Sequence, residues 1–120
     1  MSIEPEIYSL LNTLAGGHVY PDATPDDPVF PCIVYQQVGG EAYEYLERKL
    51  PDHEHSRIQI SVWAQTRDEV GPIARAARKA IIENTNFSSV ETYGAPVWLY
   101  EEALGLYGSR QDFGIWLKIS

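Results

Sequence analysis

Hydrophobic residues near the start of the chain recur at spacings of three and four. This period places them on one face of a helix, which we expect from about Glu4 to Leu14, with Gly16-Gly17 ending it. Pro5 fits this helix because it lies in the first turn, where a missing N–H costs little. The residues that share the apolar face are Ile3, Ile7, Leu10, Leu11 and Leu14.

The next part of the chain has the composition and period of strands. A brief strand is expected at residues 18–20, and a connector rich in proline and aspartate follows at residues 21–31. Residues 32–38 are β-branched and aromatic, which is typical of a strand. In residues 56–64, Ile58, Ile60 and Val62 alternate with Gln59, Ser61 and Trp63, as expected for a strand with one face on the core. Residues 39–55 then form a long hairpin loop or a protruding extension of the hairpin.

A second helix is predicted to begin at Thr66. Thr66 and Glu69 have the spacing of a capping box, in which both side chains bind backbone N–H groups at a helix start. An apolar stripe follows, formed by Val70, Ile73, Ala74, Ala77, Ala80 and Ile81, and the helix is expected to end at Asn84. Pro72 lies too deep for the first turn, so we expect either a kink or a helix that starts only after Gly71.

Two final strands are predicted at residues 97–107 and 113–119, joined by a turn at Gly108-Ser109, after a polar stretch at residues 84–94. Phe113, Ile115, Leu117 and Ile119 share one face of the last strand. The element order is helix, short strand, strand, strand, helix, strand, strand. It predicts an α+β fold with a mainly antiparallel sheet of four to five strands and two helices. At 120 residues, the chain is expected to form a single domain, residues 1–120.

The composition of the chain disfavours several classes of function. The formal net charge of −8 repels nucleic-acid phosphates, and no cluster of Lys or Arg offsets it, which disfavours sequence-specific nucleic-acid binding. The N-terminus does not resemble a secretory signal, and no apolar run approaches the ~20 residues of a membrane helix. We therefore expect a protein that is made in a reducing cytoplasm and binds no membrane. The single cysteine, Cys32, lies in an apolar run and is expected to be a buried thiol and not a nucleophile.

Few residues have a spacing that indicates chemistry. Asp52-His53-Glu54-His55 places two histidines one residue apart, which could hold zinc, but no third and fourth ligands have diagnostic spacing. A solvated polar loop is the preferred interpretation of this segment. Phosphate loops, nucleophile elbows and Cys-x-x-Cys pairs do not occur. We expect no catalytic residues, no bound metal and no cofactor.

Aromatic residues outside the predicted core suggest a docking surface. Alternation places Trp63 and Trp116 opposite the aliphatic face of the sheet. Either the first helix covers them as ordinary core, or they form a patch that another subunit buries. In the segment 39–55, Tyr43, Tyr45, Leu46 and Leu50 are mixed with charged residues, as in an arm that orders against a partner or in a hairpin folded on its own domain.

The sequence resembles a known family over nearly its whole length. The similarity lies in the order of a short helix, His18-Val-Tyr-Pro21, Pro31-Cys-Ile-Val-Tyr35, then Arg57-Ile-Gln-Ile-Ser-Val-Trp-Ala64 running into Thr66-Arg-Asp-Glu69 and an Ala-rich helix. The closing strand, Tyr107-Gly-Ser-Arg-Gln-Asp-Phe-Gly-Ile-Trp116, is similar too. These features resemble the tail-completion, or tail-terminator, proteins of long-tailed phages and prophages.

The resemblance implies a structural protein of the virion tail, made in the bacterial host cytoplasm. Such a protein caps the head-proximal end of the tail tube and joins it to head connector proteins. Members are expected to act as rings, commonly of six subunits, and to have no catalytic residues. The acidic charge of the chain adds the hypothesis that DNA passes through such a ring without specific binding. A small metal-binding or enzymatic domain, and an adaptor unrelated to phage, stay open as alternatives.

Overall fold

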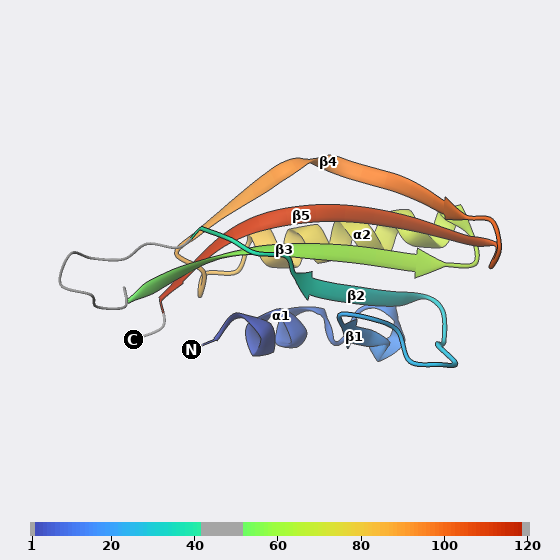
Figure 1. The fold of residues 1–120 in the computed structure, drawn as a ribbon, viewed down its shortest axis with the longest axis horizontal. Helices are drawn as coiled ribbons and strands as arrows, with labels where there is room; N and C mark the ends of the chain where they lie inside the picture. Colours follow the sequence, from blue (N-terminus) through green and yellow to red (C-terminus); the bar gives the residue numbers. More distant parts are fainter. Residues whose placement is uncertain (1, 42–51, 119–120) are drawn as a thin grey trace.

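A computed structural model describes residues 2–41 and 52–118 of the chain. Its elements are α1 (Ile3–Leu11), a short 3-10 turn η1 (Ala15–Gly17), β1 (Val19–Pro21), β2 (Cys32–Gln37), β3 (His53–Ala64), α2 (Arg67–Ile82), β4 (Ser89–Glu101) and β5 (Leu106–Lys118). Figure 1 shows these elements as an elongated molecule, with principal extents of 52 × 27 × 26 Å. The α+β fold predicted from the sequence is confirmed.

The sheet has five strands in the order β1-β2-β3-β5-β4. All neighbouring strands are antiparallel except β1 and β2, which pair in parallel. The predicted sheet, mainly antiparallel and of four to five strands, is therefore confirmed. Its two edges differ, because β1 has three residues whereas β4 has thirteen.

Both helices pack on one face of the sheet. Along β3, Ile58, Ile60 and Val62 alternate with more exposed residues and meet buried side chains of α1 and α2 in one core. We call this the core face and the opposite one the outer face. The other core residues are Ile3, Ile7, Leu11, Ala15, Val19, Ile33, Tyr35, Ala64, Val70, Ala77, Ile81, Phe87, Phe113, Ile115 and Leu117. The period of two along β3 is thus explained by a sheet that meets the core on one side.

The first helix is shorter than the sequence predicted. It ends at Leu11 and not at Leu14, and the 3-10 turn at Ala15–Gly17 follows. Leu14 has extended backbone angles but still packs against the core. Leu14 therefore contributes to the core from outside the helix. Three successive residues with positive φ, Ala15, Gly16 and Gly17, then redirect the chain into β1, and two of them are glycines, which adopt this conformation at little cost.

The second helix begins after Thr66, as predicted, but its start differs in detail. The Thr66 hydroxyl donates to the Glu69 carboxylate at 3.0 Å and makes no hydrogen bond to the backbone. The helix already includes Arg67, so a start delayed until after Gly71 is wrong, and Pro72 lies inside the helix. The helix tolerates this proline, whose side chain is exposed, because packing of Val70, Ala77 and Ile81 holds the turns around it.

The strands β3, β4 and β5 are longer than predicted, and the last turn lies elsewhere. β3 begins at His53, within the segment assigned to a loop, and β4 begins at Ser89, within the polar stretch 84–94. The predicted turn at Gly108-Ser109 is wrong, because both residues lie inside β5 and the chain reverses at residues 102–105. Gly105, at φ 64°, supplies the left-handed conformation of that turn. Ile119 of the predicted final strand lies outside the described residues.

Candidate assembly surface

Trp63 and Trp116 both lie on the outer face of the sheet, as alternation predicted. Neither helix covers them, since α1 and α2 pack on the core face. Coverage by the first helix is therefore wrong. Each ring is partly buried by neighbours in its own sheet.

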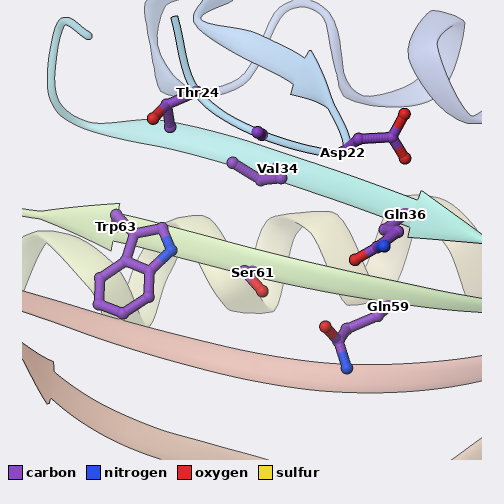
Figure 2. Close-up of a pocket in the computed structure, with 8 residues that line it drawn as sticks. Asp22, Thr24, Val34, Gln36, Gln59, Ser61 and Trp63 are labelled. Atoms are coloured by element: carbon purple, nitrogen blue, oxygen red, sulfur yellow. The ribbon is translucent and has the colours of Figure 1, made fainter. Parts of the chain in front are cut away.

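Trp63 lies over a glycine of the adjacent strand. It pairs with Gly108 of β5, and a Cβ at Gly108 would come within 2.7 Å of the Trp63 ring. The ring also borders a shallow depression of about 270 Å³, whose floor is polar (Figure 2). Gln36, Gln59 and Ser61 lie along this depression beside Asp22. One edge of Trp63 thus faces the outer surface while its face is occupied within the subunit.

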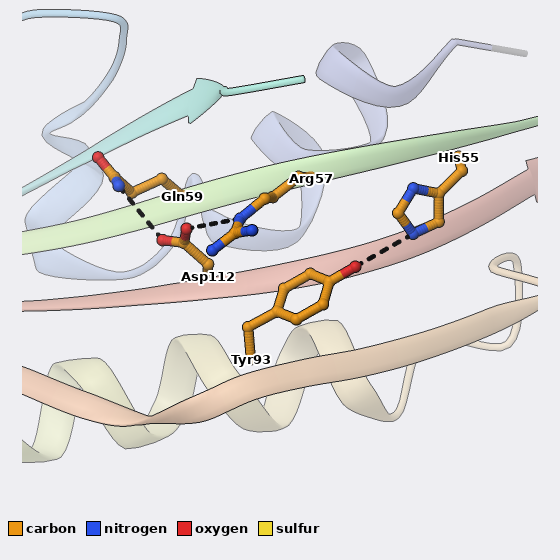
Figure 3. Close-up of polar contacts among 5 residues, drawn as sticks. All are labelled: His55, Arg57, Gln59, Tyr93 and Asp112. Carbon is orange, nitrogen blue, oxygen red and sulfur yellow. Dashed lines mark hydrogen bonds and ion pairs between the residues drawn. The ribbon is translucent and has the colours of Figure 1, made fainter. Parts of the chain in front are cut away.

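Trp116 belongs to a different group of side chains. It pairs across the sheet with His55, and the two ring centroids lie 4.9 Å apart. His55 is buried, and its Nδ1 accepts a hydrogen bond of 2.9 Å from the backbone N–H of Glu41. Nε2 therefore carries the proton of the neutral ring, and it lies 3.5 Å from the Tyr93 hydroxyl oxygen (Figure 3).

A polar network continues from this point across three strands. Arg57 of β3 donates from Nε to the Asp112 carboxylate of β5 at 2.9 Å, and its guanidinium lies 4.5 Å from the centroid of the Tyr93 ring of β4. Gln59 donates to the other oxygen of Asp112 at 3.2 Å (Figure 3). Both carboxylate oxygens of Asp112 accept hydrogen bonds, and one face of the Tyr93 ring contacts Arg57. The polar groups in this middle part of the outer face therefore find their partners within the subunit.

The two tryptophans consequently do not form one patch. Trp116 pairs with His55, eight residues before Trp63 on the same strand. At about 3.3 Å per residue, this spacing separates them by roughly 26 Å. The polar network of Arg57, Gln59 and Asp112 lies between them. The other four candidate residues, Tyr43, Tyr45, Leu46 and Leu50, fall outside the described residues.

Exposed apolar side chains gather instead on β4 and the turn that follows it. Val97 is 50% exposed, Trp98 43%, Tyr100 57% and Leu104 71%. No residue of β4 is buried, although the strand is part of the sheet. A strand was predicted for residues 97–107, but no residue of β4 was among the predicted docking residues. The continuous apolar run Val97-Trp-Leu-Tyr100 was the signal that could have indicated this surface. In a strand with one solvent-exposed face, apolar and polar residues would alternate.

A groove lies next to this region at one end of the molecule. It has a volume of about 570 Å³ and is lined by the connector between β1 and β2 and by the turn between β4 and β5. Pro25, Pro28 and Phe30 line the groove from the connector, and Leu104 and Leu106 line it from the turn and the start of β5. Apolar surface therefore extends from the edge strand around the end of the sheet.

The structure also places the residues that the sequence suggested as metal ligands or as a nucleophile. Among the described residues, no group of three or more His, Cys, Asp or Glu side chains gathers in the arrangement of a metal site. The solvated loop expected at residues 52–55 is wrong for His55, which is buried in strand β3. Cys32 is fully buried, and burial raises the pKa of its thiol to about 11, as expected for an inert side chain. Neither helix has the length and apolar character needed to cross a bilayer, among the residues described.

Comparison with known proteins identifies the family. No curated protein matches the sequence. The chain does match the family described as "Tail completion protein gp17" over residues 8–117, which include every element from the middle of α1 nearly to the end of β5. The resemblance seen in the sequence is therefore confirmed. The chain belongs to this tail completion family and is a structural component of the phage tail with a role in tail completion.

Proposed function

We propose that this protein closes the head-proximal end of the tail tube as a ring of subunits, commonly six, and joins the tube to the head connector. The chain acts as one domain in this role, without catalytic residues or a cofactor. Its partners are further copies of itself, the tail tube protein and head connector proteins.

The observation that carries this proposal is the apolar surface that the subunit leaves uncovered. Val97, Trp98 and Tyr100 lie on an edge strand without a single buried residue, and Leu104 follows in the turn. Exposed apolar groups of this kind are typical of protein–protein interfaces, and a long edge strand invites association. This surface is therefore suited to binding neighbouring subunits.

The elongated shape of the subunit suggests that its flanks and its ends bind different partners. The molecule is 52 Å long and about half as wide. Its two long flanks can face neighbouring copies in a ring, while its ends face the tube and the connector. The groove formed by Phe30, Leu104 and Leu106 at one end is a candidate docking site for one of those axial partners. The outer-face residues Trp63 and Trp116, and the segment with Tyr43, Tyr45, Leu46 and Leu50, remain candidates for further contacts.

The charge of the protein suits a channel that carries DNA. Each chain has a formal charge of −8, so six copies carry roughly −50. Carboxylates on the lumen repel phosphate groups and thereby keep DNA moving instead of binding it. A ring structure with a basic lumen would contradict this part of the proposal.

Light scattering with purified components tests the proposed function. The mass of the protein is measured alone and after mixing with tail tubes of the same phage. We expect a ring, or a capped-tube complex with a fixed number of subunits per tube. The tube-bound measurement is the decisive one, because a ring can be too weak to persist at ordinary concentrations of free subunit. A protein that stays monomeric and ignores tubes would overturn the proposal.

A further inference from the structure

We propose that neighbouring subunits contact one another head to tail, with the α2–β4 flank of one copy against the α1–β1 flank of the next. This inference rests on the proposed function, since it names the surfaces that form the ring. The occupant of each flank is a second copy of this chain.

The α2–β4 flank is basic and aromatic. Arg67, Gly71, Arg75, Arg78 and Ile82 follow one another at spacings of three and four, so they run along one side of α2. That side faces β4, because the Arg67 guanidinium lies 4.4 Å from the centroid of the Trp98 ring and a Cβ at Gly71 would lie 3.7 Å from the same ring.

Most of these side chains are exposed and can contact another protein. The three arginines are exposed, Ile82 is 44% exposed, and Trp98 and Tyr100 are exposed on the adjacent strand. Aromatic residues and arginine are the types that contribute most to protein–protein interfaces. We call this surface, made of Arg67, Arg75, Arg78, Ile82, Trp98 and Tyr100, the basic flank.

The opposite flank is acidic. Glu4 and Tyr8 lie one turn apart on α1, and both are exposed. Asp22 follows β1, and its backbone N–H donates to the Tyr35 carbonyl oxygen at 2.9 Å. Glu4, Tyr8 and Asp22 each act on Tyr35: burial raises the pKa of Tyr35, and these three groups raise it further. Glu6, on the other side of the helix, accepts a hydrogen bond from Asn86 at 3.0 Å and so faces the α2 side. We call Glu4, Tyr8 and Asp22 the acidic flank.

The distribution of charge between the two flanks is one-sided. The sequence before Arg48 contains neither Lys nor Arg, so the described residues of α1, β1 and β2 include no lysine or arginine. β1 and β4 are the two edges of the sheet, which separates the flanks by about 20 Å at ~4.8 Å per strand. Two copies that each carry −8 repel one another in most orientations. Placing the arginines of one copy against the carboxylates of the next reverses that repulsion at the contact.

The same features argue against a symmetric pair of β4 edges. Such a pair would bring the arginines of both basic flanks toward each other. The edge is also interrupted, because Pro96 has no N–H to offer and the pairing register shifts between Tyr93 and Val97. Contact through side chains with a different flank avoids both obstacles. Repeated between identical copies, a contact of two different surfaces closes into a ring when the rotation between successive copies completes a full turn.

Charge reversal tests the arrangement. Arg78→Glu alters the basic flank and Glu4→Lys alters the acidic flank, and each is expected to weaken self-association at least about tenfold, because like charges then face each other. Self-association is measured by analytical ultracentrifugation in solution and by the number of subunits bound per tail tube. An equimolar mixture of the two variants should assemble again, within about threefold of wild type, because alternating subunits restore complementary charges at every contact.

Lys79→Glu is the matched control. Lys79 is exposed and adjacent to Arg78, but it lies about 100° around the helix, on the side away from the sheet. It should assemble like wild type, and thermal unfolding should show all variants folded. Three results would overturn the inference: Arg78→Glu assembles like wild type, Lys79→Glu weakens assembly as much as Arg78→Glu does, or the mixture of the two variants does not assemble. Each of these results would leave the proposed function standing, provided that the wild-type protein assembles. If wild type assembles neither alone nor on tubes, the proposed function itself fails.

Discussion

Two glycines of β5 determine where aromatic side chains of the outer face lie. A Cβ at Gly108 would come within 2.7 Å of the Trp63 ring, and one at Gly114 would come within 2.9 Å of His55 Nε2. Neither glycine has a positive φ, so their role is to leave room and not to permit an unusual backbone. The rings of β3 can therefore lie across the neighbouring strand, which reduces the apolar area that the outer face exposes.

A pair of glycine substitutions tests this role. Gly108→Ala should lower the free energy of unfolding by about 1–3 kcal/mol, because the added methyl displaces Trp63. Gly71→Ala should raise it by about 0.5–1 kcal/mol, because alanine is the better helix residue and its methyl would meet Trp98 at an ordinary 3.7 Å. Urea unfolding of both variants gives the comparison. Equal stability of Gly108→Ala and wild type would show that Trp63 does not depend on this space.

Part of this residue-level arrangement could be predicted from the sequence. Alternation along β3 placed Trp63 opposite Ile60 and Val62, and the structure confirms it. The partner across the strand could not be predicted, because register between β3 and β5 depends on long-range pairing. The glycine that lies under Trp63 was therefore assigned to a turn.

The edge strand β4 shows why element boundaries were harder to predict than element types. Its first part, from Ser89 to Tyr93, alternates between exposed and half-buried residues and contains little apolar material. A strand at the edge of a sheet needs few buried side chains, so its pattern is that of a loop. The fold class depended on the central strands and the helices, whose periods are strong, and it was predicted correctly.

Within α2, Pro72 is expected to reduce stability. It is the sixth residue of a helix that begins at Arg67, so it removes the hydrogen bond to the carbonyl of Asp68. Pro72→Ala should raise the free energy of unfolding by about 1–3 kcal/mol, measured by thermal or urea unfolding. Pro5→Ala is the matched control, because Pro5 lies in the first turn of α1 and should change stability by less than about 0.5 kcal/mol. Equal effects of the two substitutions would contradict this explanation.

At the scale of the whole molecule, the subunit is asymmetric in two directions. Across the sheet, an acidic flank with Glu4 and Asp22 lies opposite a basic flank with Arg67 and Arg78. Along its length, the groove near Leu104 marks one end. In the ring that we propose, the flanks form the contacts between subunits and the ends are left for axial partners. The sequence predicted a need for partners, but the placement of the flanks required the strand order.

Electron microscopy of tail tubes grown with and without this protein tests the central claim most directly. The account predicts one ring of density at a single end of each tube, with its subunits in contact flank to flank, and tubes that no longer elongate at that end. Bare tube ends, protein bound along the length of the tube, or continued growth past the bound protein would contradict it.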